Sequence, residues 1–223
     1  MSYRIAAIAT LLFLSAAARA DIILMLDDGL GNSVTVADGG ALDLNPMDGA
    51  ITFVGAVGAF TTNVSSGLSA PALGTLLDPI LHLSSMNLTS DANGGSITIG
   101  LTATGFLGPF NNTNFAQSFG GTTSGSAELT SYADATNTAW GQGTTLSSFT
   151  GSGGGFGFNE TGNVNIVASP YSLTMLTTIT HGGAQASSFD AELSIPEPGT
   201  LAIFGFGLLL LGMIRKRIPV QSR

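Results

Sequence analysis

Hydrophobic and polar residues alternate one for one along several stretches of the chain. The clearest stretch is Ser96–Thr104, in which four apolar side chains are separated by threonines and a glycine: Ile97, Ile99, Leu101 and Ala103. Strict period two is typical of a β-strand with one buried face. The pattern returns in Tyr171–Ile179 and Phe189–Ile195. These three segments are therefore predicted to be strands that pack on a core.

Shorter runs of β-branched and aromatic residues, bounded by Gly, Asp, Asn and Pro, indicate further strands. They are Ile22–Leu26, Val34–Ala37, Ile51–Val64, Leu81–Leu88, Phe115–Phe119, Ala127–Ala133 and Thr144–Phe149. Gly67–Pro79 and Gly151–Gly155 are predicted loops, and no stretch between 21 and 195 has helical period. About ten short strands with regular turn signals predict an all-β fold, a single antiparallel β-sandwich that is jelly-roll-like.

Two turns predict which strands pair. Asp91–Gly95 separates Leu81–Ser90 from Ser96–Thr104, and His181–Gly183 separates the last two alternating strands. A short Gly-rich connection between two alternating runs favours a β-hairpin. We therefore expect two hairpins, one at each turn.

The N-terminal end has the layout of a secretory signal. A short basic start, Met1–Arg4, precedes the apolar run Ile5–Ala18, and Ala18 and Ala20 are small residues at the −3 and −1 positions of a cut. Residues 1–20 are therefore predicted to be a signal peptide, exported by the Sec translocon and cut by signal peptidase before Asp21. An uncleaved anchor is the alternative, because an arginine is unusual beside the cut.

The C-terminal end combines three signals in a fixed order. A Pro-Glu-Pro at 196–198 is rigid and extended, because proline fixes φ and lacks an N–H. The uncharged stretch 199–214 is a predicted transmembrane helix, and the basic cluster 215–217 holds the tail 218–223 in the cytoplasm. Leu201–Ile214 spans only about 21 Å as a helix, which suits a transient hold in the inner membrane. A buried core helix is the alternative.

This arrangement resembles the PEP-CTERM sorting signal of Gram-negative bacteria. The resemblance places the sorting motif at Pro196, Glu197 and Pro198, and the basic stop at Arg215, Lys216 and Arg217. It implies that an exosortase processes the protein and that the product reaches the cell surface or the extracellular matrix. The exported region 21–195, one predicted domain, also resembles other PEP-CTERM ectodomains in Thr35–Gly40, Ile51–Phe60 and Pro170–His181. That second resemblance implies no known activity.

Charge divides the chain as a translocated protein requires. All six Lys and Arg lie in the signals or the tail, and all 14 Asp and Glu lie between Asp21 and Glu197. Basic ends with an acidic middle satisfy the positive-inside rule. A domain without Lys or Arg has no cations to neutralise phosphates, which argues against nucleic-acid binding.

Catalytic patterns are missing from the exported region, so we expect no enzyme. There is no cysteine and no G-x-S-x-G, and the Asp-Gly pairs are typical of turns. His82 and His181 have no catalytic partner in the sequence, so both are interpreted as structural or solvated. A glycosidase with two carboxylates close in space is the alternative that sequence leaves open.

No tightly held cofactor is expected, and calcium is the one metal that this composition suits. Calcium takes oxygen ligands, and the candidates are Asp27, Asp28 and Asp38, or Asp91 with Asn93. None has EF-hand spacing, so ordinary turn aspartates are the competing interpretation.

Two functions follow from different features. The leading hypothesis is a non-enzymatic structural or adhesive protein of the cell surface, or of an exopolysaccharide matrix such as a biofilm. The second is a glycan-binding, or less readily glycan-processing, domain in which Trp140 and Tyr132 stack on a sugar ring. A buried Trp140 with a flat Ser/Thr surface favours the first, and an open groove lined by Trp140 and two facing carboxylates favours the second.

Overall fold

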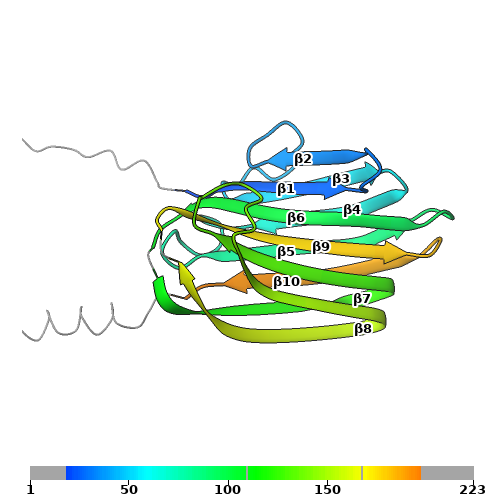
Figure 1. The fold of residues 1–223 in the computed structure, drawn as a ribbon. Coiled ribbons are helices and arrows are strands. Elements are labelled where there is room, and N and C mark those ends of the chain that lie inside the picture. The colour runs from blue at the N-terminus through cyan, green and yellow to red at the C-terminus, as the bar shows by residue number, and fades with distance from the viewer. Residues whose placement is uncertain (1–18, 109, 167, 197–223) are drawn as a thin grey trace, which may run out of the picture.

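In the computed structural model, residues 19–108, 110–166 and 168–196 are described, and they form ten β-strands (Figure 1). The strands are β1 (Asp21–Asp27), β2 (Ser33–Ala37), β3 (Ala50–Val57), β4 (Phe60–Leu68), β5 (Ile80–Ser90), β6 (Gly95–Phe106), β7 (Phe110–Asp134), β8 (Thr144–Ile166), β9 (Tyr171–His181) and β10 (Ala186–Ser194). The all-β prediction is confirmed. Within these residues no helix has the length and apolar character needed to cross a membrane. The predicted signal helix and transmembrane helix lie outside them.

All strands belong to one antiparallel sheet in the order β2-β1-β6-β9-β7-β10-β5-β4-β3, with β8 paired to β7. The long strand β7 connects the two halves of this sheet. Its residues 126–134 pair with β9, whereas its residues 116–123 pair with β10. The sheet therefore folds over at the middle of β7, and the layer β2-β1-β6-β9 comes to face the layer β3-β4-β5-β10 (Figure 1).

The core fills the space between the two layers. Alternate residues of β1 and β6, including Leu24 and Leu101, are fully buried, as the period-two pattern predicts. The layers approach closely where Gly67 of β4 meets Leu101 of β6. A Cβ added at Gly67 would lie 2.3 Å from Leu101 Cδ1, so this glycine makes room for the opposite layer.

Both predicted hairpins are wrong. β5 pairs with β4 and β10, and β6 pairs with β1 and β9, so the connection at Asp91–Gly95 crosses from one layer to the other. The connection between β9 and β10 crosses in the same way. Alternation with period two indicates which face of a strand is buried, but it carries no information about which strand lies beside it.

Two predicted boundaries are also wrong. Phe115–Phe119 and Ala127–Ala133 belong to one continuous strand, β7, and the predicted loop Gly151–Gly155 lies inside β8. Gly153 and Gly154 have φ of 60° and 99°, a conformation that glycine adopts readily. These residues bend β8 without ending its pairing with β7. Phe149 and Phe158, on either side of the bend, stack with ring centroids 4.7 Å apart.

Candidate functional site

The last strand leads into the Pro-Glu-Pro without a linker. β10 ends at Ser194, and the next residue, Ile195, is fully buried and donates its N–H to the Pro79 carbonyl oxygen at 3.1 Å. Pro196 follows and is exposed, beside a hollow of about 390 Å³. Glu197, Pro198 and the basic stop 215–217 lie outside the described residues. The folded domain therefore ends where the candidate sorting segment begins.

The N-terminal end lies at the same end of the molecule (Figure 1). Asp21, the residue after the predicted cut, is the first residue of β1. Ala20 is buried and donates its N–H to the Ala70 carbonyl oxygen at 3.3 Å, and the exposed Arg19 forms an ion pair with Asp48 at 3.4 Å. Ala18 lies outside the described residues, and the cut itself stays a prediction.

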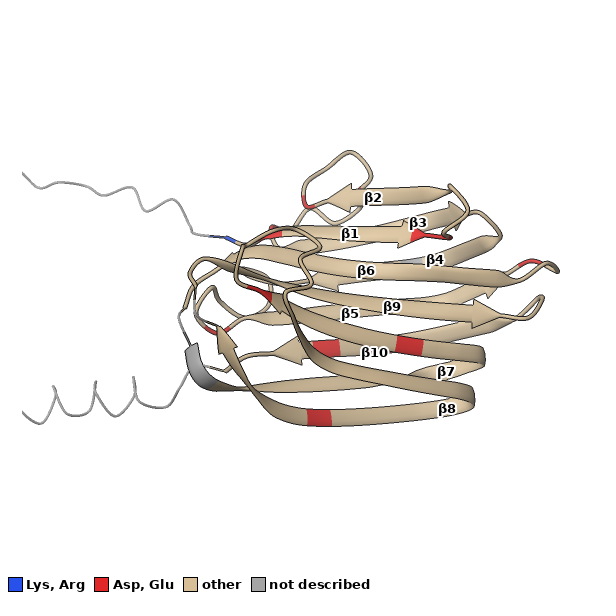
Figure 2. Cartoon of the chain, in the orientation of Figure 1, with Lys and Arg blue, Asp and Glu red and all other residues tan. Residues whose placement is uncertain are grey.

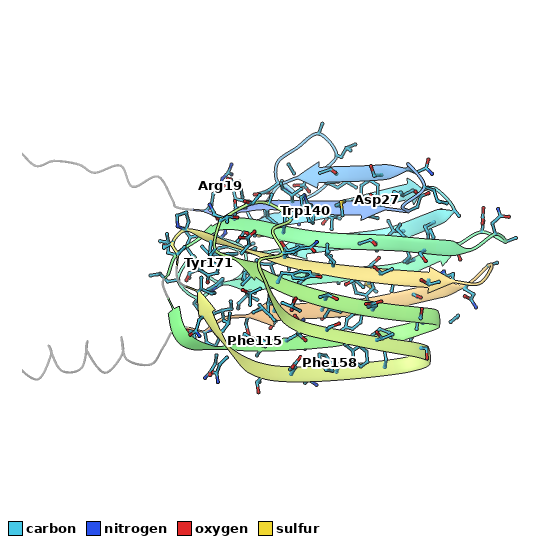
Figure 3. All side chains as sticks on the ribbon, in the orientation of Figure 1. Arg19, Asp27, Phe115, Trp140, Phe158 and Tyr171 are labelled. Atoms are coloured by element: carbon cyan, nitrogen blue, oxygen red, sulfur yellow. The ribbon has the colours of Figure 1, made fainter. Side chains whose placement is uncertain are left out.

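Trp140 lies on the outer face of a layer, not in the core between the layers (Figure 3). The connection from β7 to β8 folds back over β6, where the Trp140 N–H donates to Thr102 Oγ1 at 3.2 Å. The indole packs on Gly100, since a Cβ added there would lie 2.8 Å from Trp140 Cζ3. Trp140 is half-buried as a result, and Thr102 beneath the loop is fully buried.

Tyr132 shares that outer face but not the position of Trp140. It is half-buried on β7, in register with Thr174 of β9, which is in turn in register with Thr102 of β6. Two strand spacings, about 10 Å, therefore separate Tyr132 from β6. On this face, hydroxyl pairs join β6 to β9: Ser96–Thr180 and Thr98–Thr178 at 2.8 and 3.1 Å, and the fully buried pair Thr102–Thr174 at 2.9 Å.

The calcium candidates do not all come together. Asp27 is the last residue of β1 (Figure 3) and Asp28 follows it, whereas the Asp38 N–H donates to the Ile22 carbonyl oxygen near the start of β1. Five residues of strand, about 17 Å, separate Asp27 from Ile22, so Asp38 cannot share an ion with the other two. In the part of the chain that the structure describes, no three His, Asp or Glu gather closely enough to hold a metal ion.

Each of these aspartates accepts backbone hydrogen bonds in its own loop. Asp28 accepts the Leu30 N–H at 2.8 Å and the Asn32 side-chain amide at 2.7 Å, and these bonds lower the pKa of its carboxyl, with the bond from Asn32 the larger cause. Asp27 accepts the Gly29 N–H, and Asp38 accepts the Gly49 N–H. Asp91 likewise accepts the backbone and side-chain N–H groups of Asn93. Their observed contacts are those of turn residues.

Comparison with known families identifies the C-terminal segment. Residues 194–217 match the model of the PEP-CTERM protein-sorting motif. The chain carries a PEP-CTERM sorting signal. Such a signal marks an exported protein that transits the membrane to the cell surface and is processed by an exosortase. The match begins at Ser194, inside β10, so the signal is continuous with the fold.

The remaining comparisons add no function. No curated protein matches the chain. Among solved structures, TmCBM61 in complex with β-1,4-galactotriose is 7% identical, with 59% of this chain and 87% of that chain covered and a TM-score of 0.34. The enzymatically active domain of tailspike protein 4 from bacteriophage CBA120 is 9% identical, with 63% and 18% covered and a TM-score of 0.32. Likenesses this low carry no argument about this PEP-CTERM protein.

The opposite outer face of the PEP-CTERM ectodomain holds a polar pair that the sequence did not reveal. His82 Nε2 lies 2.8 Å from Asp190 Oδ2, although 108 positions separate the two residues. Beside Asp190 is a hollow of about 330 Å³, floored by Gly120 and Gly121 and flanked by the exposed Met86. Only the pairing of β10 with both β5 and β7 brings these residues together, and no local pattern signals it.

His181 is buried between two serines. Its Nδ1 and Nε2 each lie 2.7 Å from a hydroxyl oxygen, that of Ser90 and that of Ser187. The hydroxyls of Ser187 and Thr123 are themselves 2.7 Å apart. All four side chains are almost inaccessible, so this group joins β5, β7, β9 and β10 inside the fold. The interpretation of His181 as a structural residue agrees with these contacts.

Proposed function

We propose that this PEP-CTERM protein is structural or adhesive cargo, delivered to the cell surface or the exopolysaccharide matrix of a Gram-negative bacterium. Its ectodomain is a jelly-roll-like β-sandwich that acts without catalysis. The observation that carries the proposal is the continuity of the last strand with the sorting signal at Ser194–Pro196. What the exosortase delivers is therefore the β-domain itself, with no linker between cargo and signal.

The outer surface supports an adhesive role. The layer that contains β6 and β9 presents paired Ser and Thr hydroxyls, which are neutral donors and acceptors for hydrogen bonds to a polymer. The domain has no Lys or Arg between 21 and 195. It therefore approaches acidic polysaccharide through such neutral bonds or through bridging divalent cations, and not through ion pairs.

The geometry of Trp140 favours this proposal over the glycan-binding alternative. Stacking on a sugar needs a free aromatic face, and Trp140 is half-buried against Gly100. Tyr132 lies two strands from β6 and does not form an aromatic pair with Trp140. Trp140 is neither buried in the core nor, among the described residues, grouped with two carboxylates, so its half-buried position on the outer face meets neither expectation in full.

The sorting part of the proposal is tested by the fate of the C-terminus. The protein is expressed in a host with and without its exosortase, and intact mass and location are measured for each. We expect loss of the segment after the Pro-Glu-Pro and surface or matrix location only where the exosortase is present. The double substitution Pro196→Ala and Pro198→Ala should retain the full-length, membrane-held form, whereas Pro170→Ala, outside the signal, should not. An identical C-terminus in both strains would falsify the proposal.

A further inference from the structure

The sheet has three strands with an open edge among the described residues, and two of them are protected. β2 is only five residues long. The start of the β3 edge is covered by the preceding loop, since the Leu44 N–H donates to the Thr52 carbonyl oxygen at 2.9 Å and the Thr52 N–H donates to Asp43 Oδ1 at 3.0 Å. A register irregularity between Phe53 and Gly55 interrupts the rest of this eight-residue strand. Proteins protect edges in these ways because unpaired backbone groups recruit further strands.

β8 has neither protection. It is 23 residues long and, among the strands that the structure describes, it pairs with β7 alone. It contains no proline and no lysine, the residues that usually guard an edge. In an antiparallel pair, every second residue of an edge strand directs its N–H and C=O away from its neighbour. β8 therefore presents a long row of backbone donors and acceptors on its outer side.

The edge is held in a defined shape. Ser147 Oγ donates to Glu160 Oε2 at 2.6 Å, and Phe149 stacks on Phe158, so contacts between the two halves of β8 hold its bend. Phe156 and Phe119 pack beside them with ring centroids 4.8 Å apart. The backbone of β8 is thus ordered before any partner arrives, which lowers the entropic cost of adding a strand.

Charge limits which partner suits this edge. Every Asp and Glu except Glu197 lies between 21 and 195, without any Lys or Arg, so two copies repel over most of their surface. β8 carries a single charged residue, Glu160, whose carboxylate is bound by Ser147 (Figure 2). A charged foreign partner finds no complementary group along β8. A second copy presents the same neutral Ser, Thr, Gly and Asn edge and meets little repulsion there.

We propose that β8 is a self-association edge, at which the outer side of β8 in one copy pairs antiparallel with β8 of a second copy and joins their sheets. The contact is two-fold and closes as a dimer, because each copy uses the same strand. This inference rests on the proposed structural function, in which sorted copies accumulate at one surface. A second copy of the same chain is the partner that this structural role requires.

The cysteine-free chain allows a direct test with single cysteines. Gly157→Cys, Asn159→Cys, Thr161→Cys and Asn163→Cys place a thiol at exposed positions of β8, and Ser118→Cys, on β7 opposite Asn159, is the matched control. The full chain, purified in one detergent, is oxidised over a range of concentrations. Residues opposite each other in an antiparallel pair lie close enough for a disulfide. We expect several-fold more disulfide dimer at the β8 position nearest the two-fold axis than at Ser118→Cys.

Hydrogen exchange of the unmodified chain supplies a second measurement. Outward N–H groups of β8 should gain protection as concentration rises, while the Thr52 N–H of β3 should not change, because it already donates to Asp43. Equal cross-linking at β8 and at Ser118→Cys, or protection of β8 that is independent of concentration, overturns the proposal. Neither measurement depends on the exosortase. A correctly sorted monomer therefore rejects only the self-association edge, and an associating protein that is not sorted rejects only the proposed function.

Discussion

At the scale of single residues, His181 shows how hydrogen bonds select one state of a side chain. Ser90 Oγ donates to the Gly183 carbonyl oxygen at 2.7 Å, so its only proton is used, and it must accept from His181 Nδ1–H. Nε2 is then the acceptor for the Ser187 hydroxyl, which accepts in turn from Thr123. Every polar atom of the group is satisfied only while the imidazole is neutral. A proton on Nε2 would reverse the chain of donors.

Because these hydrogen bonds require a neutral His181 imidazole, the free energy of unfolding depends on pH. Burial lowers the pKa of His181 below its ordinary value of 6.5. As the pH falls below about 6.5, the unfolded imidazole takes up a proton while the folded one resists, so the unfolded state binds more protons and the free energy of unfolding falls. We expect a constant melting temperature above about pH 7 and a decline below about pH 6.5, measured by circular dichroism. His181→Gln should flatten that decline and His82→Gln should not. Parallel profiles for the native chain and His181→Gln would contradict this.

At the scale of elements, β7 joins the two layers that enclose the core, and β8 pairs along β7. β7 pairs with one layer through its first half and with the other through its second half. Side chains from the two halves of β8, including Phe149 and Phe158, stack on each other and pack against the core. Aromatic rings bury large apolar areas, so this cluster stabilises the bend as a unit.

The bond between Ser147 and Glu160 contributes to that stability. Ser147 is 3% exposed, and its removal leaves a half-buried carboxylate with one donor fewer. Ser147→Ala should lower the free energy of unfolding by about 1 kcal/mol, the usual worth of such a bond. Ser148→Ala, at the exposed position beside it, should change it by less than about 0.5 kcal/mol. Urea denaturation measures both, and equal effects would mean that the bond does not brace β8.

At the scale of the whole molecule, the ectodomain is acidic without internal compensation. Among the described residues, Arg19 is the one Lys or Arg, and it lies before the predicted cut (Figure 2). Uncompensated like charges destabilise a compact state. The acidic side chains lie at both ends of the strands and within β7, β8 and β10, so the repulsion is spread over the molecule.

Divalent cations should relieve this repulsion more than monovalent ones. Millimolar calcium is expected to raise the melting temperature above that in sodium chloride of equal ionic strength, measured by scanning calorimetry. Because Asp27 and Asp28 already bind their own loop, Asp28→Asn should leave the calcium effect largely intact. Equal shifts in both salts would reduce the effect to screening.

The sequence by itself determined the strand character, the buried faces and the sorting signal of this protein. Alternation at Ile97, Leu101 and Met175 is local, and so is the order of Pro-Glu-Pro, apolar run and basic cluster. Each of these features depends on neighbours in the chain, and physical rules for one strand or one membrane segment are enough to interpret them.

Only the tertiary structure decided which strands are neighbours. The turns at Asp91–Gly95 and His181–Gly183 predicted hairpins, but both connections cross between layers. A strand that buries one face can pair with any neighbour of matching register, so the packing of the whole core selects the neighbouring strand. That choice brings Ser90 to His181, His82 to Asp190 and Trp140 to Gly100, and it leaves the outer edge of β8 open.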